Sequence, residues 1–529
     1  MNTHVPTSAT AETDAASVRT WLEGPDEIAF IDVREEGQFG LSHPLLAVNI
    51  PYSRLEPEVL RLVPRRTTRI VLADADDGVA ARARRRLEAL GYTDVHILKG
   101  GALAWRETGK PLFEGVNVPS KAFAEVVEHA FGTPHIAAED LRPLVESGAD
   151  VVVIDNRTAE EFERFHVPGA TNAPGVDLVH RISDLVPSPE TFVVVSCAGR
   201  TRGIMGAQSL ISAGLPNRVA ALAGGTQGWR LAGFELERGA RPSPAPSAEA
   251  RKAARERAAK LIAEHGLPVI SGPVLNGWRA EDGRTTYLFD VRSPAEYRAG
   301  HAAGAVSAPG GQLLQTLDTF AAVRGARIVL TDDDTARAAI TAYWLKQLGW
   351  DVAILDPDTP RDETDGPPAP PLPEVPFIAA AEARAWLGEE GAVLAVTSSA
   401  AYRNAHPAGA VWGIRPRLDA AAARLGAARR VLVVGEQDGV AALAARDLAE
   451  SADIEAAALK GGLAAWTAAG LPVEASPGEP PDSERIDFLF WNHDRHNGNP
   501  DHSRGYLNWE HQLPKQIEED GGAGYRLAL

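Results

Sequence analysis

The chain has 529 residues, of which 44% are hydrophobic and 23% charged, a composition normal for several soluble globular domains. Its formal net charge of −18 argues against a nucleic-acid partner, because polyanion binding needs a basic surface. The single cysteine excludes an internal disulfide framework and any metal site built from several cysteines.

The start of the chain predicts neither export nor membrane insertion. Residues 1–17 are polar and acidic, and they lack the positive start and apolar core of a signal peptide. No run of 18 apolar residues occurs, so we expect no transmembrane helix and no membrane partner. With one cysteine, a reducing, cytoplasmic setting is the simplest interpretation.

A first strand-like motif occurs four times along the chain. Its copies are FIDVREEGQFGLSH (30–43), VIDNRTAEEFERFH (153–166), LFDVRSPAEYRAGH (288–301) and LAVTSSAAYRNAH (394–406). In each copy a histidine stands 11 positions after a fixed slot, which gives the pairs Asp32 and His43, Asp155 and His166, Asp290 and His301, and Ala395 and His406. The near-equal spacing indicates a duplicated domain.

A second apolar strand follows each copy and ends in a second slot. These strands are RIVLAD (69–74), FVVVSC (192–197), RIVLTD (327–332) and RVLVVG (430–435), so the slot holds Asp74, Cys197, Asp332 and Gly435. A Gly-Gly and Trp segment closes three of the four copies, as KGGALAW (99–105), AGGTQGW (223–229) and KGGLAAW (460–466). The third copy has only ILDPDTP there.

Each copy predicts an α/β domain. Short runs of Val, Ile and Leu alternate with longer helical patterns, as in a central parallel sheet flanked by helices. Helices are expected after the second slot, at 78–92 and 203–215, ending at Gly91 and Gly214. A loop between a strand end and a helix start is the usual ligand position in open α/β sheets.

The repeats predict four domains and three other segments. The domains are expected at 12–116, 119–240, 267–360 and 377–475, with a linker and charged helix at 241–266, a proline-rich linker at 361–376 and a C-terminal tail at 476–529.

The tail does not repeat and is rich in His, Asn, Asp and Trp. Its acidic and imidazole side chains offer N and O donors for a metal, but their spacing matches no firm zinc signature; they are His493, Asp494, His496, Asp501 and His502. We therefore predict no metal and no cofactor. The tail is expected to pack across domains through Trp491, Tyr506 and Trp509, and a position over Cys197 is open.

The segment around Cys197 is the candidate reactive site. Backbone N–H groups, a helix dipole and the charges of Arg200 and Arg202 are expected to lower the thiol pKa. Gly199 and Gly203 let the backbone curl with its N–H groups inward, which predicts a ring that holds an anion around a nucleophile. The alternatives are a buried structural cysteine and solvated arginines. Because the other copies hold Asp, Asp and Gly in this slot, folding does not require cysteine.

These motifs resemble the rhodanese homology domains of the sulfurtransferase family. VIDNRTAEEFERFHVPGATNAP (153–174) is similar to the family's first motif, VVVSCAGRTRG (193–203) to its active-site loop, and AGGTQGW to its closing segment. The resemblance covers about residues 15–475 and is strongest to bacterial proteins with four tandem domains. It implies four rhodanese-like domains plus a C-terminal extension, with the first, third and fourth inactive.

The resemblance implies an enzyme in which Cys197 carries sulfur as a persulfide. The persulfide and the substrate would be held by Ala198, Gly199, Arg200, Thr201, Arg202 and Gly203. The donor would be a small sulfur-containing anion, thiosulfate first, with mercaptopyruvate or a persulfide from cysteine catabolism as competitors. The acceptor would be cyanide, a thiol or a protein thiol.

Two other functions remain open at this point. One is a sulfur relay, in which the inactive domains dock a partner and Cys197 only carries sulfur. The other is a phosphatase or arsenate reductase, which the loop length disfavours. Related phosphatases place an Arg six positions after the cysteine, whereas here that position is Gly203 and Arg202 is five positions on.

Three further residues are expected to support the site by bracing the fold. Asp155 and Arg157 follow a buried strand, and His166 closes the first motif. The same residue types recur in copies without cysteine, which favours structural roles over catalytic ones.

Overall fold

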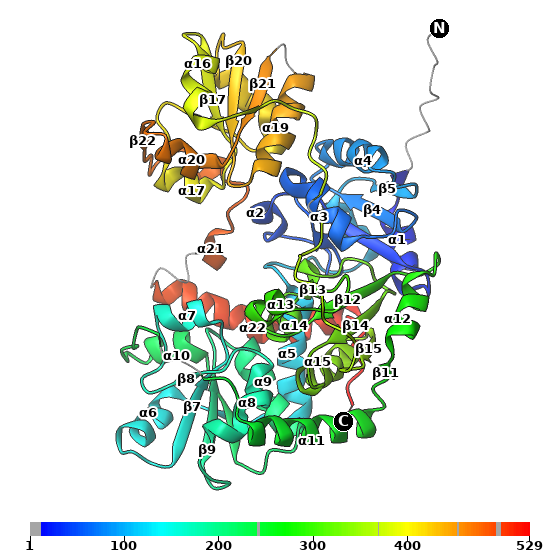
Figure 1. Cartoon of the computed structure of the whole chain (residues 1–529), viewed down its shortest axis with the longest axis vertical. Coiled ribbons are helices and arrows are strands. Elements are labelled where there is room, and N and C mark those ends of the chain that lie inside the picture. The colour runs from blue at the N-terminus through cyan, green and yellow to red at the C-terminus, as the bar shows by residue number, and fades with distance from the viewer. Residues whose placement is uncertain (1–11, 241–243, 369, 452–453, 494–498, 529) are drawn as a thin grey trace. The chain divides into compact units, whose positions relative to one another are not determined.

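The computed structural model describes residues 12–240, 244–368, 370–451, 454–493 and 499–528 (Figure 1). The described chain contains four five-stranded parallel sheets with one strand order. In each of these sheets the strands, numbered along the chain within that sheet, run 1-5-4-2-3, so the strand before the second slot is the central one. In the fourth domain two further short strands pair in a separate antiparallel sheet. This confirms the predicted α/β fold.

Domain 2 holds Cys197 and the most complete set of motifs. Its strands are β6 (His135–Ile136), β7 (Val151–Asp155), β8 (Thr171–Asn172), β9 (Phe192–Ser196) and β10 (Val219–Leu222). Its helices are α5 (Val118–Phe131), α6 (Ala138–Glu146), α7 (Ala159–Arg164), α8 (Asp177–Leu185), α9 (Thr201–Ser212) and α10 (Gly225–Leu231).

Every residue of β9 is buried, because helices cover both faces of the sheet. Val194 packs in a cluster with side chains of α6, α7 and α10. Val195, on the opposite face, lies against α9, where a Cβ on Gly206 would come within 2.9 Å of it. The alternation of β9 side chains thus fixes which helix stands behind the cysteine loop.

Domain 1 repeats this plan. Its elements are β1 (Glu12–Thr13), α1 (Ala15–Glu23), β2 (Ile28–Asp32), α2 (Glu36–Phe39), β3 (Val48–Asn49), η1 (Tyr52–Arg54), α3 (Leu55–Leu62), β4 (Arg69–Ala73), α4 (Val79–Ala89), β5 (Val95–Leu98) and η2 (Ala102–Thr108).

Domain 3 follows a helix, α11 (Ala248–His265), in the expected linker. Ser247 caps α11 by accepting a hydrogen bond from the Ala250 N–H at 3.0 Å. The domain comprises β11 (Val269–Ile270), α12 (Gly272–Arg279), β12 (Thr286–Asp290), α13 (Pro294–Ala299), β13 (Val306–Ser307), α14 (Gly310–Gln315), η3 (Leu317–Thr319), β14 (Arg327–Thr331), α15 (Ala336–Gln347) and β15 (Asp351–Leu355).

Domain 4 retains the sheet although its motifs are the most degenerate. It comprises β16 (Phe377–Ile378), η4 (Ala380–Glu382), α16 (Ala383–Leu387), β17 (Gly391–Ala395), α17 (Ser399–Asn404), β18 (His406–Pro407), β19 (Val411–Trp412), η5 (Arg415–Arg417), α18 (Leu418–Arg424), β20 (Arg430–Val434), α19 (Asp438–Ser451), β21 (Glu455–Leu459), α20 (Gly462–Ala468) and β22 (Val473–Glu474). The tail adds η6 (Asp482–Glu484), α21 (Phe490–His493) and α22 (Pro500–Asp520).

The domains associate in a nested order that the sequence did not predict. One compact unit combines most of domain 1 with domain 4, and the other combines domains 2 and 3 with α22 and with residues 20–29 of domain 1. In the first unit Arg415 of domain 4 donates to both carboxylate oxygens of Glu56 of domain 1, at 2.6 and 2.7 Å, in a buried ion pair. In the second unit α22 packs along α5.

None of the described helices combines the length and the apolar character that a membrane crossing requires.

Candidate active site

Cys197 lies in the turn between the central strand β9 and helix α9, and it is 2% exposed. The first turn of α10 holds this loop from one side. The Thr226 N–H donates to the Cys197 carbonyl at 2.8 Å, and the Gln227 N–H donates to the Ala198 carbonyl at 3.1 Å. Gly225 makes the approach possible, since its φ is +54° and a Cβ there would lie 2.3 Å from the Cys197 carbonyl oxygen.

Helix α9 begins two residues earlier than the sequence predicted. The Ile204 N–H donates to the Arg200 carbonyl at 3.0 Å, so the first helical turn already includes Thr201. Thr201 and Arg202 therefore stand on the first turn of the helix, and Gly203 is inside it. The Gly203 N–H hydrogen-bonds the Cys197 sulfur, which favours its ionised form.

In the equivalent loops of domains 1 and 3, backbone N–H groups bind the side chain that replaces cysteine. The Asp74 carboxylate accepts hydrogen bonds from the N–H groups of Asp76 and Ala80, both at 2.9 Å. The Asp332 carboxylate accepts from the N–H groups of the residues that open α15, at 2.6, 2.8 and 3.0 Å; the donors are Thr335, Arg337 and Ala338. In both domains the loop N–H groups converge on a carboxyl group in the slot. These hydrogen bonds favour the ionised form, although burial raises the pKa of both Asp74 and Asp332.

The pKa of Cys197 moves opposite to the expected direction. Burial raises the pKa of the thiol from its ordinary value of 9 to about 11, and the Glu510 carboxyl adds to the rise. The positive charge of Arg202 and the Gly203 N–H act against it without reversing it. The expectation of a lowered pKa was wrong because it counted local charges and helix ends but not the cover over the loop.

Arg202 forms a two-pronged ion pair that the sequence did not reveal. Its Nη1 and Nη2 lie 2.6 and 2.8 Å from the two carboxylate oxygens of Glu161 on α7. Burial alone raises the Glu161 pKa, but the hydrogen bonds and charge of Arg202 dominate and lower it to about 2. The guanidinium is therefore fixed in direction beside the cysteine loop.

Arg200 is also held by carboxylates. Its Nε and Nη2 each lie 2.8 Å from a carboxylate oxygen of Glu125 on α5, and Nη2 also contacts Glu128. Arg200 is 9% exposed, so it is not the solvated surface charge considered as an alternative. In the structure its guanidinium joins α5 to the start of α9.

The C-terminal helix α22 covers the loop, a position that the sequence left open. The Thr201 hydroxyl donates to Glu510 at 3.1 Å, and a Cβ on Gly199 would lie 3.1 Å from the other Glu510 oxygen and 3.3 Å from the Tyr506 ring. Glu510 is 1% exposed, and burial together with the nearby Glu125 carboxylate raises its pKa. Trp509 packs on Tyr506 and Trp491, as expected for a tail anchored by aromatic residues.

A cleft of about 270 Å³ runs between domains 2 and 3 next to the loop. Arg202 and Asn156 line it from domain 2, and Arg292 lines it from domain 3. The backbones of Gly175 and Gly311 meet at the cleft, where a Cβ on either glycine would lie within 2.5 Å of the other residue. Domain 3 therefore supplies one wall of the approach to Arg202.

Asp155, Arg157 and His166 lie in the core of domain 2. Both carboxylate oxygens of Asp155 accept from the Arg157 guanidinium at 2.8 to 3.1 Å, and the two residues are 0% and 1% exposed. The His166 ring stacks on Phe162, and its Nδ1 lies 2.9 Å from the Phe162 carbonyl. The same contacts occur in domains 1 and 3, at Asp32 with Arg34, His43 with Phe39, Asp290 with Arg292 and His301 with Tyr297.

The described residues offer one cluster with metal-ligand geometry, the carboxylates of Asp332, Asp333 and Asp334. Each already has a partner, since Asp332 accepts backbone N–H groups, Asp333 pairs with Arg337 at 2.7 Å and Asp334 lies 2.9 Å from His180. In the tail group considered from the sequence, Asp494 and His496 lie outside the described residues.

Comparison with known proteins places these features in a family. The model of the rhodanese-like domain matches residues 14–108, 137–232 and 277–358, more than half of the chain. A crystal structure of a thiosulfate sulfurtransferase from Pseudomonas aeruginosa is 43% identical, covers 98% of this chain and 100% of its own, and superposes with a TM-score of 0.93.

Two curated relatives match over shorter stretches. An uncharacterised protein of Synechocystis is 31% identical over 105 residues, which is 20% of this chain and 58% of the relative. A candidate sulfur carrier protein of Bacillus subtilis is 26% identical over 102 residues, which is 19% of this chain and 54% of the relative. The chain thus spans about half the length of these relatives. Through its matched domains, the chain belongs to the family of rhodanese-like proteins.

Proposed function

We propose that this protein is a sulfurtransferase in which Cys197 takes the outer sulfur of thiosulfate, or of a similar anionic donor, and passes it to cyanide or a thiol. The observation that carries the proposal is that the repeated loop donates backbone N–H hydrogen bonds to the side chain in its slot. Two copies turn their N–H groups onto an aspartate, and domain 2 places cysteine in the same slot. A persulfide on Cys197 is an anion of the kind this turn accommodates.

The chemistry needs two displacement steps. The Cys197 thiolate attacks the outer sulfur of thiosulfate, the S–S bond breaks, and sulfite leaves with the bonding pair. The acceptor then attacks the terminal sulfur of the persulfide, and the thiolate leaves. The N–H groups from Ala198 to Gly203 hold the negative charge between the two steps. No cofactor is needed because no net electron transfer to the protein remains.

The arginines divide into two roles under this proposal. Arg202 lines the cleft and is aimed by Glu161, so it meets the incoming donor. Arg200 is held by Glu125 and keeps the start of α9 in place, which makes it a positioning residue. Asp155, Arg157 and His166 support the loop through the core of domain 2.

Intact mass and turnover together test the proposal. Treatment with thiosulfate should add one sulfur, about 32 Da, to each chain, and cyanide should remove it with release of thiocyanate. Cys197→Ser should abolish both signals. Asp74→Asn, which changes the same slot in domain 1, should leave both unchanged. Loading of two sulfurs, or any loading of Cys197→Ser, would contradict a one-site mechanism.

A sulfur relay is the second candidate, favoured by the cover of α22 over Cys197. A relay predicts sulfur loading without efficient turnover on small acceptors, and transfer to one protein thiol instead. Steady-state rates with thiosulfate or 3-mercaptopyruvate as donor, and cyanide or a small thiol as acceptor, separate the two. Efficient turnover with any of these pairs supports the enzyme.

A further inference from the structure

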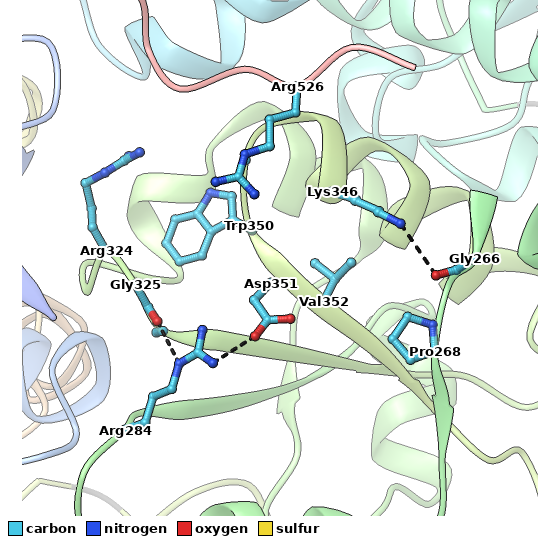
Figure 2. Close-up of a pocket in the computed structure, with 12 residues that line it drawn as sticks. Gly266, Pro268, Arg284, Arg324, Gly325, Lys346, Trp350, Asp351, Val352 and Arg526 are labelled. Atoms are coloured by element: carbon cyan, nitrogen blue, oxygen red, sulfur yellow. Dashed lines mark hydrogen bonds and ion pairs between the residues drawn. The ribbon is translucent and has the colours of Figure 1, made fainter. Parts of the chain in front are cut away.

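Domain 3 contains a larger cavity, of about 550 Å³, at the edge of its sheet where the strands begin. Arg284 comes just before β12, Arg324 just before β14, and Asp351 opens β15 (Figure 2). The slot residue Asp332 follows the other end of β14. The cavity therefore lies at the opposite sheet edge from the repeated loop, and it is not a remnant of a cysteine site.

Positive charge dominates the lining of this cavity. Its ionisable side chains are four cations and one carboxylate, namely Arg284, Arg324, Lys346, Arg526 and Asp351. Asp351 is matched by Arg284, whose Nη1 lies 2.9 Å from its carboxylate. Three cations remain around the same space in a chain whose net charge is −18. Of these, Arg324 also interacts electrostatically with the Asp318 carboxyl behind the lining, so Lys346 and Arg526 are the cations without a nearby carboxylate among the residues that line the cavity. Such a cluster concentrates small anions.

Two of these cations have unused hydrogen-bonding capacity. Lys346 donates to the His265 carbonyl at 2.7 Å, but no described residue gives the guanidinium of Arg324 or Arg526 a hydrogen bond or an ion pair. By contrast, Arg200 and Arg202 at the cysteine loop each bind a carboxylate. Two open guanidinium groups at one cavity offer the forked donors that match phosphate oxygens.

The segment that carries Arg526 is fixed in place. The Arg526 N–H donates to the Gln347 carbonyl at 2.7 Å, and the Ala528 N–H donates to the Gln347 side chain at 3.0 Å. One residue earlier, the Tyr525 hydroxyl donates to the Pro119 carbonyl at 2.6 Å. Figure 2 shows Arg526 reaching from this segment toward the half-buried ring of Trp350, which gives the cavity a planar apolar surface.

We propose that this cavity binds a polyphosphate anion, either free or carried by a nucleoside, through Arg324, Lys346 and Arg526. The volume lies within the range of small-molecule sites and is large for a single oxoanion. The positive charges and the open guanidinium N–H groups favour a ligand with several phosphate oxygens. The ring of Trp350 offers a surface on which a nucleobase can stack. The site stands on its own residues and does not depend on sulfur transfer.

Calorimetric titration of the full chain tests the site with ADP, tripolyphosphate and adenosine as probes, without added metal. Both anions should bind with submillimolar Kd, and binding should weaken as salt is raised. Equal affinity for the two anions assigns the site to free polyphosphate, and tighter binding of ADP assigns it to a nucleotide. Adenosine binding as well as ADP, or neither anion binding at 1 mM, would overturn the proposal.

Matched arginine variants tie the binding to the cavity. Arg324→Gln and Arg526→Gln should each weaken binding about tenfold or more, as expected for the loss of a charge-assisted hydrogen bond. Arg298→Gln, at an exposed position on α13 outside the cavity, should bind like the parent. Unchanged affinity in both cavity variants, with a urea-unfolding midpoint like that of the parent showing that the chain is folded, would place any anion binding elsewhere.

Discussion

The covered thiol of Cys197 makes a quantitative prediction about its reactivity. A pKa of about 11, against an ordinary value of 9, lowers the thiolate fraction at pH 8 from about one in ten to about one in a thousand. Alkylating agents react with the thiolate. We therefore expect iodoacetamide to modify the native chain about a hundredfold more slowly than the chain unfolded in urea, a difference of about 3 kcal/mol.

A variant of Glu510 separates the two causes that raise the pKa of Cys197, burial of the thiol and the nearby negative charge. Glu510→Gln keeps the shape of the side chain over the loop but removes its charge, so the alkylation rate above pH 8 should rise, by about tenfold at most for one nearby charge. Glu518→Gln, exposed on the same helix, is the matched control and should not change the rate.

Mass spectrometry of quenched time points gives the rates for native, unfolded and variant chains from pH 7 to 11. The native rate should climb throughout this range, because the thiol is still half protonated near pH 11. Equal rates for native and unfolded chains at pH 8, or a native midpoint near pH 9, would show that burial does not raise the pKa of the Cys197 thiol.

Three further substitutions test the supports of the site. Gly225→Ala should lower thiosulfate turnover at least about tenfold, because its Cβ would collide with the cysteine loop. Gly233→Ala is the control and should stay active. Its φ is also positive, at +82°, but no atom lies near the added Cβ, so only the backbone strain of the substitution remains. Arg157→Met leaves a buried carboxylate uncompensated and should destabilise the unit of domains 2 and 3 by about 3–5 kcal/mol in urea unfolding. Glu161→Gln should lower the free energy of unfolding by about 1–2 kcal/mol at pH 7, a figure reduced to allow for the partial exposure of the side chain. The pKa of Glu161 is lowered to about 2 in the folded chain. The difference between variant and parent should therefore disappear as the pH falls from 4.5 to 2 in urea unfolding.

The repeat spacing was enough to predict the sheets and the position of Cys197. Four copies of the same strand pattern restrict each segment to one α/β plan, and the slot at the end of the central strand then follows. Even domain 4, which has lost Asp and Cys from its slots, keeps this order because its apolar runs remain.

The partners of the loop could not be predicted in the same way. Glu125 lies on α5, and Glu510 reaches Thr201 across 309 positions of sequence, so neither belongs to the repeated motif. The pKa of Cys197 shows the same limit. Arg202 and the Gly203 N–H favour the thiolate, whereas burial of the thiol and the charge of Glu510 raise its pKa. In the structure Glu161 closes a capping box with Thr158 and also binds Arg202, and the sequence patterns indicated neither contact.

The cover supplied by α22 also has a consequence for the order of events during synthesis. The loop residue Thr201 leaves the ribosome 309 residues before Glu510, which corresponds to roughly 15–60 s at ordinary elongation rates. During that interval domain 2 can form its sheet while its thiol stays open to oxidants and to other nascent chains. The newly made protein is thus most vulnerable to oxidation before its last helix docks, and a reductant present during translation protects a residue that the finished fold shields by itself.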